Sequence, residues 1–187
     1  MDMYKSIAYN TDKYNFSDLV ENLFSVPGLS FLHKETTEKY PELFKIGADS
    51  TTVFHKKFYD KYRAGWPEFE QVYENFIKEI IAKYIFLGES FVYQKFPTFR
   101  VHLPGNVAVG AFHNDSEFGH PDGEVNFIVP LTSAKDTASV WVESEEGKKD
   151  FSPMRMLEGE FILFNGNKLT HGNKVNLTNK TRVSIDF

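Results

Sequence analysis

Residues 154–173, MRMLEGEFILFNGNKLTHGN, alternate short apolar runs with turn residues. Glu158–Gly159 and Gly166–Asn167 are typical turn pairs, and the run between them is almost entirely apolar. Apolar runs of this length, bounded by turn residues, are characteristic of β-strands. The strands that we predict here are 154–157, 160–164 and 168–171.

The pattern extends to both sides of this stretch, from Phe91 to the last residue. Apolar residues recur there with a period of two, and turn residues such as Pro104–Gly105 separate the runs. Many short strands at close spacing favour a β-sandwich or barrel over a parallel α/β sheet. The further strands that we predict are 91–94, 98–103, 109–113, 124–131, 138–143 and 182–187.

Residues 1 to about 90 carry helix signals instead. The segment Trp66–Leu87 is the clearest, because Pro67 suits a first helical position and apolar residues then recur at three- and four-residue steps. Ser17 precedes DLVENLF and predicts an N-cap. The stretch from about Glu35 to Arg63 has a weaker pattern that fits one or two shorter helices.

We therefore expect one domain over residues 1–187. Its fold class is mainly β with N-terminal helices: a helical part of about 1–90 buttresses one face of a β core of about 91–187. A phenylalanine count of 19 fits a core rich in aromatic rings.

Composition excludes several classes of function. Hydrophobic residues make up 41% of the 187 residues and charged residues 25%, which is an ordinary globular balance. The net charge of −5 offers no footprint for nucleic acid or for an anionic membrane surface. The absence of cysteine excludes disulfides, iron–sulfur clusters and thiol nucleophiles, so a metal site must use His, Asp and Glu. Neither a secretory signal nor a membrane-spanning run is visible, and we expect a cytoplasmic protein.

The candidate metal ligands are His113, Asp115 and His171. Alternate residues on an extended chain share one face, so His113 and Asp115 can converge on one point while Asn114 points away. His171 belongs to another predicted strand and is followed by a glycine that permits close backbone approach. Two imidazoles and one carboxylate on one face of a metal, with the other face open, are typical of non-haem Fe(II) oxygenases.

The open positions of such a site leave room for dioxygen and a bidentate 2-oxo acid. The distal carboxylate of 2-oxoglutarate would need a cation, preferably a guanidinium fork. Arg182 and Ser184 alternate on the last predicted strand and therefore share a face that suits a carboxylate.

The set His113, Asp115, His171, Arg182 and Ser184 resembles the HxD…H…RxS pattern of the Fe(II)/2-oxoglutarate-dependent dioxygenases. From Phe99 onward the chain is similar in particular to the small oxygenases of the streptomycin-biosynthesis type. The matching segments are RVHLPGNVAVGAFHNDSEFGHPDGEVNFIVPLTSAKDTASVWVESEEG, GEFILFNGNKLTHGN and TRVSIDF.

This resemblance implies a double-stranded β-helix (jelly roll, cupin-like). It implies that His113, Asp115 and His171 bind Fe(II) and that Arg182 and Ser184 hold the distal carboxylate of 2-oxoglutarate. Related halogenases have a small residue in place of the carboxylate ligand, so the presence of Asp115 favours oxygenation over halogenation.

Other polar residues of the β half have two readings each. Asn126 is an inward polar group beside the cofactor or a satisfied buried amide. His120 is a rival ligand or a loop residue at the mouth of the site, next to turn residues. Polar strand residues contact the substrate or are ordinary parts of the strands. The candidates for substrate contact are Arg100, His102, His120, Glu143 and Asn165.

The function predicted is hydroxylation of a C–H bond in a small polar molecule, with dioxygen as oxidant and conversion of 2-oxoglutarate to succinate. One alternative is a cupin-like metal enzyme that does not use 2-oxoglutarate, although cupins typically show HxH where this chain has His113 and Asp115. Another is a non-catalytic jelly-roll module that binds a sugar or other small ligand. In each case the partner is a small molecule rather than a nucleic acid or a membrane.

Overall fold

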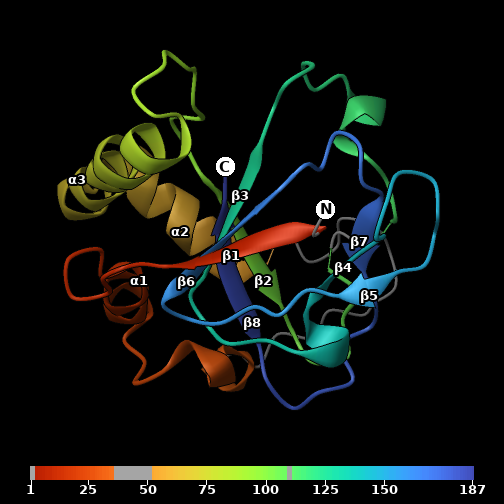
Figure 1. Ribbon diagram of the computed structural model, residues 1–187. Coiled ribbons are helices and arrows are strands. Elements are labelled where there is room, and N and C mark those ends of the chain that lie inside the picture. The colour runs from red at the N-terminus through yellow and green to blue at the C-terminus, as the bar shows by residue number, and fades with distance from the viewer. Residues whose placement is uncertain (1–2, 36–51, 109–110) are drawn as a thin grey trace.

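The computed structural model describes residues 3–35, 52–108 and 111–187, and its elements are stacked in layers (Figure 1). A five-stranded sheet lies between the helices on one side and a three-stranded sheet on the other, and every strand pair is antiparallel. The expected class, mainly β with N-terminal helices, is confirmed. The bounds are β1 (Tyr4–Ala8), α1 (Phe16–Phe24), η1 (Leu29–Glu35), α2 (Val53–Ala64), α3 (Pro67–Phe76), the π-helix η3 (Ile77–Ile85), β2 (Thr98–His102), η4 (Asp115–Phe118), β3 (Asn126–Pro130), η5 (Asp136–Ala138), β4 (Val140–Val142), β5 (Ser152–Pro153), β6 (Glu160–Phe164), β7 (His171–Asn173) and β8 (Arg182–Asp186).

The larger sheet has the order β1-β6-β3-β8-β2, and the smaller has the order β5-β4-β7. Alternation along the central strands divides their side chains between two cores. In β3, Phe127 and Val129 belong to the core under the helices, whereas Ile128 belongs to the core between the two sheets. In β8, Val183 and Ile185 face the helices, so Arg182 and the other alternate residues face the smaller sheet.

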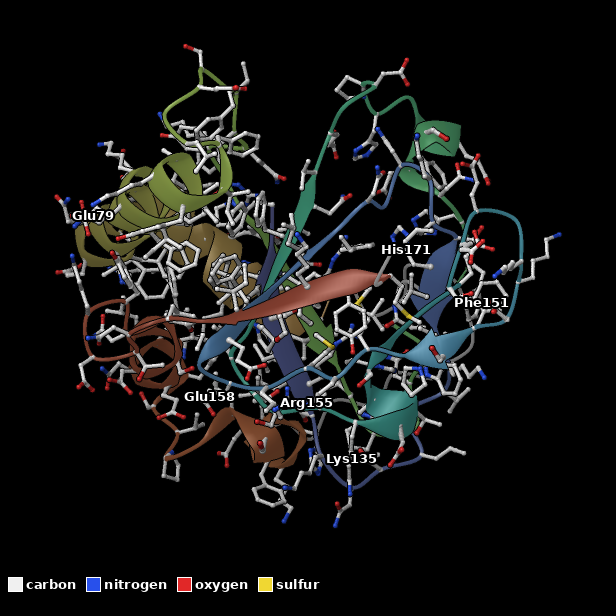
Figure 2. The ribbon with its side chains drawn as sticks, viewed as in Figure 1. Glu79, Lys135, Phe151, Arg155, Glu158 and His171 are labelled. Atoms are coloured by element: carbon white, nitrogen blue, oxygen red, sulfur yellow. The ribbon has the colours of Figure 1, made fainter. Side chains whose placement is uncertain are left out.

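The core under the helices is built mainly from aromatic rings. Phe58 of α2 stacks on Phe99 of β2 with ring centroids 4.2 Å apart and planes 3° apart. Phe76 meets Phe16 of α1 and Phe161 of β6 edge-on. Figure 2 shows rings filling the space between the helices and the sheet, with Glu79 on the outer side of the helical layer. Burial of these rings fixes the helices on the sheet face opposite the smaller sheet.

The predicted helix over Trp66–Leu87 is confirmed, but its second half is π-helical. The α-helix ends at Phe76, and the Phe86 N–H then bonds the Ile81 carbonyl at 3.1 Å, five residues back. The N-cap prediction for Ser17 is wrong. Helix α1 already begins at Phe16, and the Ser17 hydroxyl donates instead to the Leu131 carbonyl at 3.3 Å. Within the stretch from Glu35 to Arg63, residues 36–51 lie outside the described part, and α2 covers most of the rest.

Two strand predictions in this group are wrong, and one strand was missed. Residues 91–94 pair with no described strand, and the hydroxyls of Tyr73 and Tyr62 donate instead to the carbonyls of Gln94 and Lys95. Strand β1 was not expected, yet it pairs with all of β6 at one edge of the larger sheet. The strand expected at 168–171 begins only at His171.

Five strand predictions agree with the structure to within a few residues: 98–103 with β2, 124–131 with β3, 138–143 with β4, 160–164 with β6 and 182–187 with β8. The predicted strand 154–157 is wrong, because β5 ends at Pro153 and only Met156 makes an isolated bridge, to Ala134. Of the strand expected at 109–113, residues 109–110 lie outside the described residues, and His113 makes an isolated bridge to His171. Among the helices of the described ranges, none has the length and apolar character needed to cross a bilayer.

Candidate active site

His113 and His171 are partners across an antiparallel bridge. The His113 N–H donates to the His171 carbonyl at 3.0 Å, and the His171 N–H donates to the His113 carbonyl at 2.8 Å. Both side chains therefore leave the backbone at one place, and their ring centroids lie 4.8 Å apart. Gly172 permits this, because a Cβ at that position would lie 3.0 Å from the backbone of Phe112. Figure 2 shows His171 at β7 of the smaller sheet, on the other side of the molecule from α1, α2 and α3.

The second nitrogen of each ring is fixed by the backbone. His113 Nδ1 bonds the Ala111 carbonyl at 2.8 Å, and His171 Nδ1 bonds the Leu169 carbonyl at 3.0 Å. A carbonyl only accepts, so both Nδ1 atoms carry hydrogen and both Nε2 atoms of the neutral rings keep a lone pair. This is the arrangement that holds metal-ligating histidines in one tautomer and one orientation.

Asp115 completes the group. Its Oδ1 lies 3.5 Å from His113 Nε2 and 3.6 Å from His171 Nε2. Ligand atoms about 2.1 Å from a common ion lie roughly 3–3.5 Å apart at angles between a right angle and the tetrahedral angle. The three residues therefore fit one divalent ion, and His113, Asp115 and His171 form a group whose ligand atoms lie within 4.8 Å of one another.

The Asp115 carboxylate is itself held by its neighbours. Asn126 Nδ2 donates to Oδ2 at 2.8 Å, and Asn126 Oδ1 accepts from the Gly166 N–H at 2.7 Å. The Asp115 N–H donates to the Gly166 carbonyl at 2.9 Å. A Cβ on Gly166 would lie 2.3 Å from Asp115 Oδ2, so only glycine fits there. Oδ2 is thus occupied, and Oδ1 is the oxygen turned toward the imidazoles.

The protonation states of Asp115 and His171 suit a cation, whereas His113 holds a second proton more strongly than a free imidazole does. Burial raises the pKa of Asp115, but the His113 hydrogen bond and the charge of His171 outweigh it, and the pKa lies below its ordinary value. Burial lowers the pKa of His171. The hydrogen bond to Asp115 raises the pKa of His113. At neutral pH Asp115 is therefore charged and His171 neutral, as metal ligation requires.

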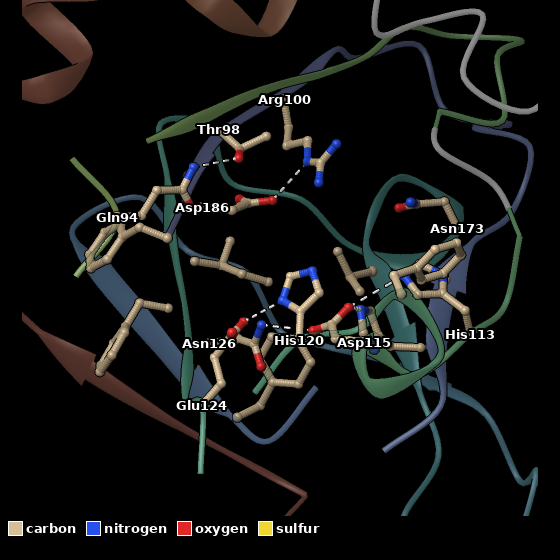
Figure 3. Close-up of a pocket in the computed structure, with 18 of the residues that line it drawn as sticks. Gln94, Thr98, Arg100, His113, Asp115, His120, Glu124, Asn126, Asn173 and Asp186 are labelled. Carbon is tan, nitrogen blue, oxygen red and sulfur yellow. Dashed lines mark hydrogen bonds and ion pairs between the residues drawn. The ribbon is translucent and has the colours of Figure 1, made fainter. Parts of the chain in front are cut away.

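These ligands line a cavity of about 220 Å³ between the two sheets, drawn in Figure 3. Arg182, with 3% of its surface exposed, reaches the same cavity, and its Nη1 donates to Asn173 Oδ1 at 2.8 Å. Arg100 lines the cavity too, with its Nε 3.0 Å from Asp186 Oδ2. Ser184 lies on the same strand face and donates to Asp186 Oδ1 at 3.0 Å. The structure thus brings the predicted ligands and a buried guanidinium to one cavity.

His120 stands at the mouth of this cavity. Its Nδ1 lies 2.7 Å from Glu124 Oε1, and its side chain is 45% exposed. Asp115, His120 and Glu124 also form a group whose ligand atoms lie within 4.8 Å of one another. This second group is more exposed, and one nitrogen of its single histidine is already bonded to Glu124. The first group offers two Nε2 atoms, so it is the better metal site.

Three of the predicted substrate contacts lie elsewhere. His102 is fully buried, with Nε2 2.8 Å from the Asn106 carbonyl, and burial together with the Arg182 charge lowers its pKa to about 3. Glu143 is fully buried, and its carboxylate accepts from the backbone N–H groups of Thr170 and Lys149. Asn165 caps the turn at Lys168. Each supports the backbone, and none lines the cavity of the metal group.

Some residues of the cavity were not predicted. Asn173 and Asp186 alternate with His171 and with Ser184, so the face-sharing argument used for Arg182 could have found both. Gly166 carried no such signal, because a glycine before an asparagine indicates only a turn.

Comparisons with known proteins extend this picture. No protein-family model matches the chain. The streptomycin biosynthesis protein StrG of Streptomyces griseus is 34% identical over 191 residues, and the alignment spans 100% of this chain and 84% of StrG. A prolyl hydroxylase from Trichoplax adhaerens, solved in complex with a hypoxia inducible factor peptide fragment, aligns with a TM-score of 0.52 and 12% identity over 100% of this chain and 82% of that one. A prolyl-4-hydroxylase from Pseudomonas putida aligns with a TM-score of 0.42 and 13% identity over 100% and 91% of the two chains. The chain shares its fold with the Trichoplax enzyme.

Proposed function

The chain belongs to the family of the streptomycin biosynthesis protein StrG, and we propose that it is an Fe(II)- and 2-oxoglutarate-dependent oxygenase that hydroxylates a C–H bond of a small polar molecule. We further infer that its two antiparallel sheets form a double-stranded β-helix. The observation that carries the proposal is the convergence of His113 Nε2, His171 Nε2 and Asp115 Oδ1 on one side of a cavity that Arg182 also lines.

The residues present fit an Fe(II) ion. Two imidazoles and one carboxylate supply three ligands, and the cavity lies on their open side. Bound there with 2-oxoglutarate, the iron would supply activation of dioxygen and oxidation of a C–H bond, with release of succinate and CO2. The protein's part is to hold a hydrogen on Nδ1 of each imidazole, so that Nε2 is the nitrogen that binds an ion, and to hold Asp115 Oδ1 toward them through Asn126 and Gly166.

Arg182 would hold the distal carboxylate of 2-oxoglutarate. Its guanidinium is buried in the cavity, where a charge-assisted hydrogen bond to a carboxylate is strong. Asn173 accepts from one of its nitrogens and so orients the fork, and Ser184 lies on the same face of β8. A cupin-like enzyme without 2-oxoglutarate would have no use for a buried cation at this place.

The test is a visible spectrum recorded without oxygen. Addition of Fe(II) and 2-oxoglutarate to the protein should produce a weak metal-to-ligand charge-transfer band, which neither alternative function predicts. In Arg182→Met the band should appear only at 2-oxoglutarate concentrations about 30-fold higher or more, since loss of one partner of a buried charged pair costs at least about 2 kcal/mol. Absence of the band in the parent protein would refute the proposal, and an unchanged midpoint in the variant would refute the role of Arg182.

A further inference from the structure

A second cavity, of about 480 Å³, lies on the helical side of the mouth. The π-helix contributes Ile77 and Ile81 to its wall, and the segment after it contributes Phe86 and Phe91, whose rings stack with centroids 4.4 Å apart. Phe127 closes the side toward the larger sheet. We call this cavity the apolar chamber.

The apolar chamber adjoins the cavity of about 220 Å³ that His113, Asp115 and His171 line, which we call the metal cavity. The residues that line both are Gln94, His120, Glu124, Phe127 and Phe187. Figure 3 shows the hydrogen-bonded pair of His120 and Glu124 projecting into the space between the candidate ligand Asp115 and Gln94. A molecule that extends from the metal group toward the helices therefore passes this pair and enters the chamber.

The charges of the chamber are of one sign. Asp122 and Glu124 line it, and among the described residues of its wall there is neither a lysine nor an arginine. Glu124 is 28% exposed at its side chain, and only its Oε1 is bonded to His120. An ionised carboxylate can accept several hydrogen bonds, so Glu124 can bind an ammonium group while it holds His120. The metal cavity, in contrast, has charges of both signs, because two arginines line it together with three carboxylates.

The chamber wall is also structurally unusual. The segment Ile77–Ile85 forms consecutive π-helical turns rather than the single bulge that is the usual form. π-Helical turns are rare and are often found at functional sites. Ile77 and Ile81 are buried beneath the chamber, so the apolar surface that a ligand would cover is that of the half-buried Phe86 and Phe91 and the exposed Val92.

We propose that the apolar chamber binds the substrate, and that the small polar molecule of the proposed function is one that carries an amine on an apolar group. The apolar group lies against Phe86 and Phe91, the ammonium group binds Glu124, and the carbon to be oxidised faces the metal group. That the bound molecule is a substrate, and that it is oxidised, rests on the proposed function. The binding of an amphiphilic cation in the chamber stands without it.

The experiment is a calorimetric titration of the metal-free protein with primary n-alkylamines from butylamine to decylamine, and with the n-alkanoates of the same lengths. Affinity for the amines should rise by about fourfold for each added methylene that enters the chamber. The alkanoates should bind at least about tenfold more weakly at each length. Equal affinity for both series, or no dependence on chain length, would overturn the proposal.

Two pairs of variants locate the binding. Glu124→Gln should remove the preference for amines, whereas Glu68→Gln, which deletes the same charge from the exposed first turn of α3, should keep it. Phe91→Ala should reduce the gain per methylene, whereas Phe31→Ala, at a 44% exposed position on η1, should not. Equal effects within either pair would mean that amines bind elsewhere, and the proposal would fall.

The two proposals fail separately. The titration uses neither iron nor 2-oxoglutarate. If the protein binds the amines but shows no charge-transfer band, amine binding in the chamber is supported and the oxygenase function is refuted. If it shows the band but binds no amine, the oxygenase function is supported and amine binding in the chamber is refuted. With both present, an amine that binds tightly should also stimulate succinate formation in air.

Discussion

The two sides of the cavity are held by different means. On the metal side, His113 and His171 bond each other's backbone, and each ring bonds the carbonyl two residues before it; Asp115 is tied to the backbone at Gly166. On the mouth side, His120 bonds the side chain of Glu124. Backbone partners are fixed by the fold, whereas side-chain partners can change with one substitution. The candidate ligands are therefore held more firmly than the mouth, although only His171 of the three belongs to a strand.

The largest effect is expected where the metal side loses a ligand. Asp115→Ala should abolish iron-dependent formation of succinate from 2-oxoglutarate, because two imidazoles alone leave the ion without its anionic ligand. Succinate released in air is the measurement. Asp60→Ala, which removes an exposed carboxylate from α2, is the control and should keep full turnover. Iron-dependent turnover that survives in Asp115→Ala would show that the ligands are wrongly assigned.

A smaller effect is expected from crowding the ligand rather than removing it. Gly166→Ala places a methyl group against the Asp115 carboxylate and the Asn126 amide, so affinity for Fe(II) should fall ten- to a hundredfold. Anaerobic competition with a chelator measures this. Gly28→Ala is the matched control, because nothing lies within 4 Å of a Cβ there. If the two variants bind iron with equal affinity, close packing at Gly166 does not position the Asp115 carboxylate.

Glu143 supports the backbone beside His171 by accepting from the Thr170 N–H, and we expect this contact to stabilise the fold. Burial raises the pKa of Glu143, but the N–H donors of Lys149 and Thr170 outweigh it and lower the pKa from 4.5 to about 2. A lowered pKa in the folded state means that the stabilisation is present above pH 4.5 and is lost as the pH falls toward 2.

Glu143→Gln should therefore reduce the free energy of unfolding by about 2 kcal/mol at pH 7. The difference from the parent protein should shrink below pH 4.5, the unfolded value of the carboxyl. Denaturant unfolding at pH 7, 5 and 3 measures it, and Glu145→Gln in the exposed neighbouring turn is the control. If the difference in unfolding free energy between Glu143→Gln and the parent protein stays constant with pH, the charge of Glu143 does not stabilise the backbone at Lys149 and Thr170.

The smallest effect is expected at the mouth. His120→Ala should change Fe(II) affinity by no more than about twofold, as for other exposed positions, because its Nδ1 is bonded to Glu124 and Asp115 is held by other residues. The same chelator competition measures this. If His120→Ala lost as much Fe(II) affinity as Gly166→Ala, the group of Asp115, His120 and Glu124 would be favoured as the metal site. The metal side and the mouth side of the cavity would then not differ in their importance for iron binding.

The sequence predicted the elements that have a strong period. Strand β6 and the helical segment from Pro67 were predictable because buried apolar residues recur with the period of the element. Strand β1 was missed because it is an edge strand, and three of its five residues are exposed. Residues 91–94 alternate like a strand, but tyrosine hydroxyls from the helical layer bond the carbonyls at the end of this segment.

The candidate ligands were predictable for a similar reason. Face-sharing at His113 and Asp115 is local, and His171 stood out as the histidine of another predicted strand that a glycine follows; the resemblance then implied the same three residues. The roles of His102 and Glu143 could not be predicted, because a buried polar residue that satisfies the backbone and one that faces a ligand look alike in a sequence. The carbonyl partners that fix the imidazoles come from loop geometry, which no side-chain pattern encodes.

The reciprocal backbone bridge between His113 and His171 has a consequence for metal supply. Because backbone hydrogen bonds hold the two histidines together, we expect this site to be emptied and refilled without unfolding, unlike a zinc finger. Its intrinsic ranking of ions follows the general order in which copper and zinc exceed ferrous iron. The ion that occupies it in a cell would then be decided by which metals the surroundings deliver, so purified material reports the growth medium as much as the protein.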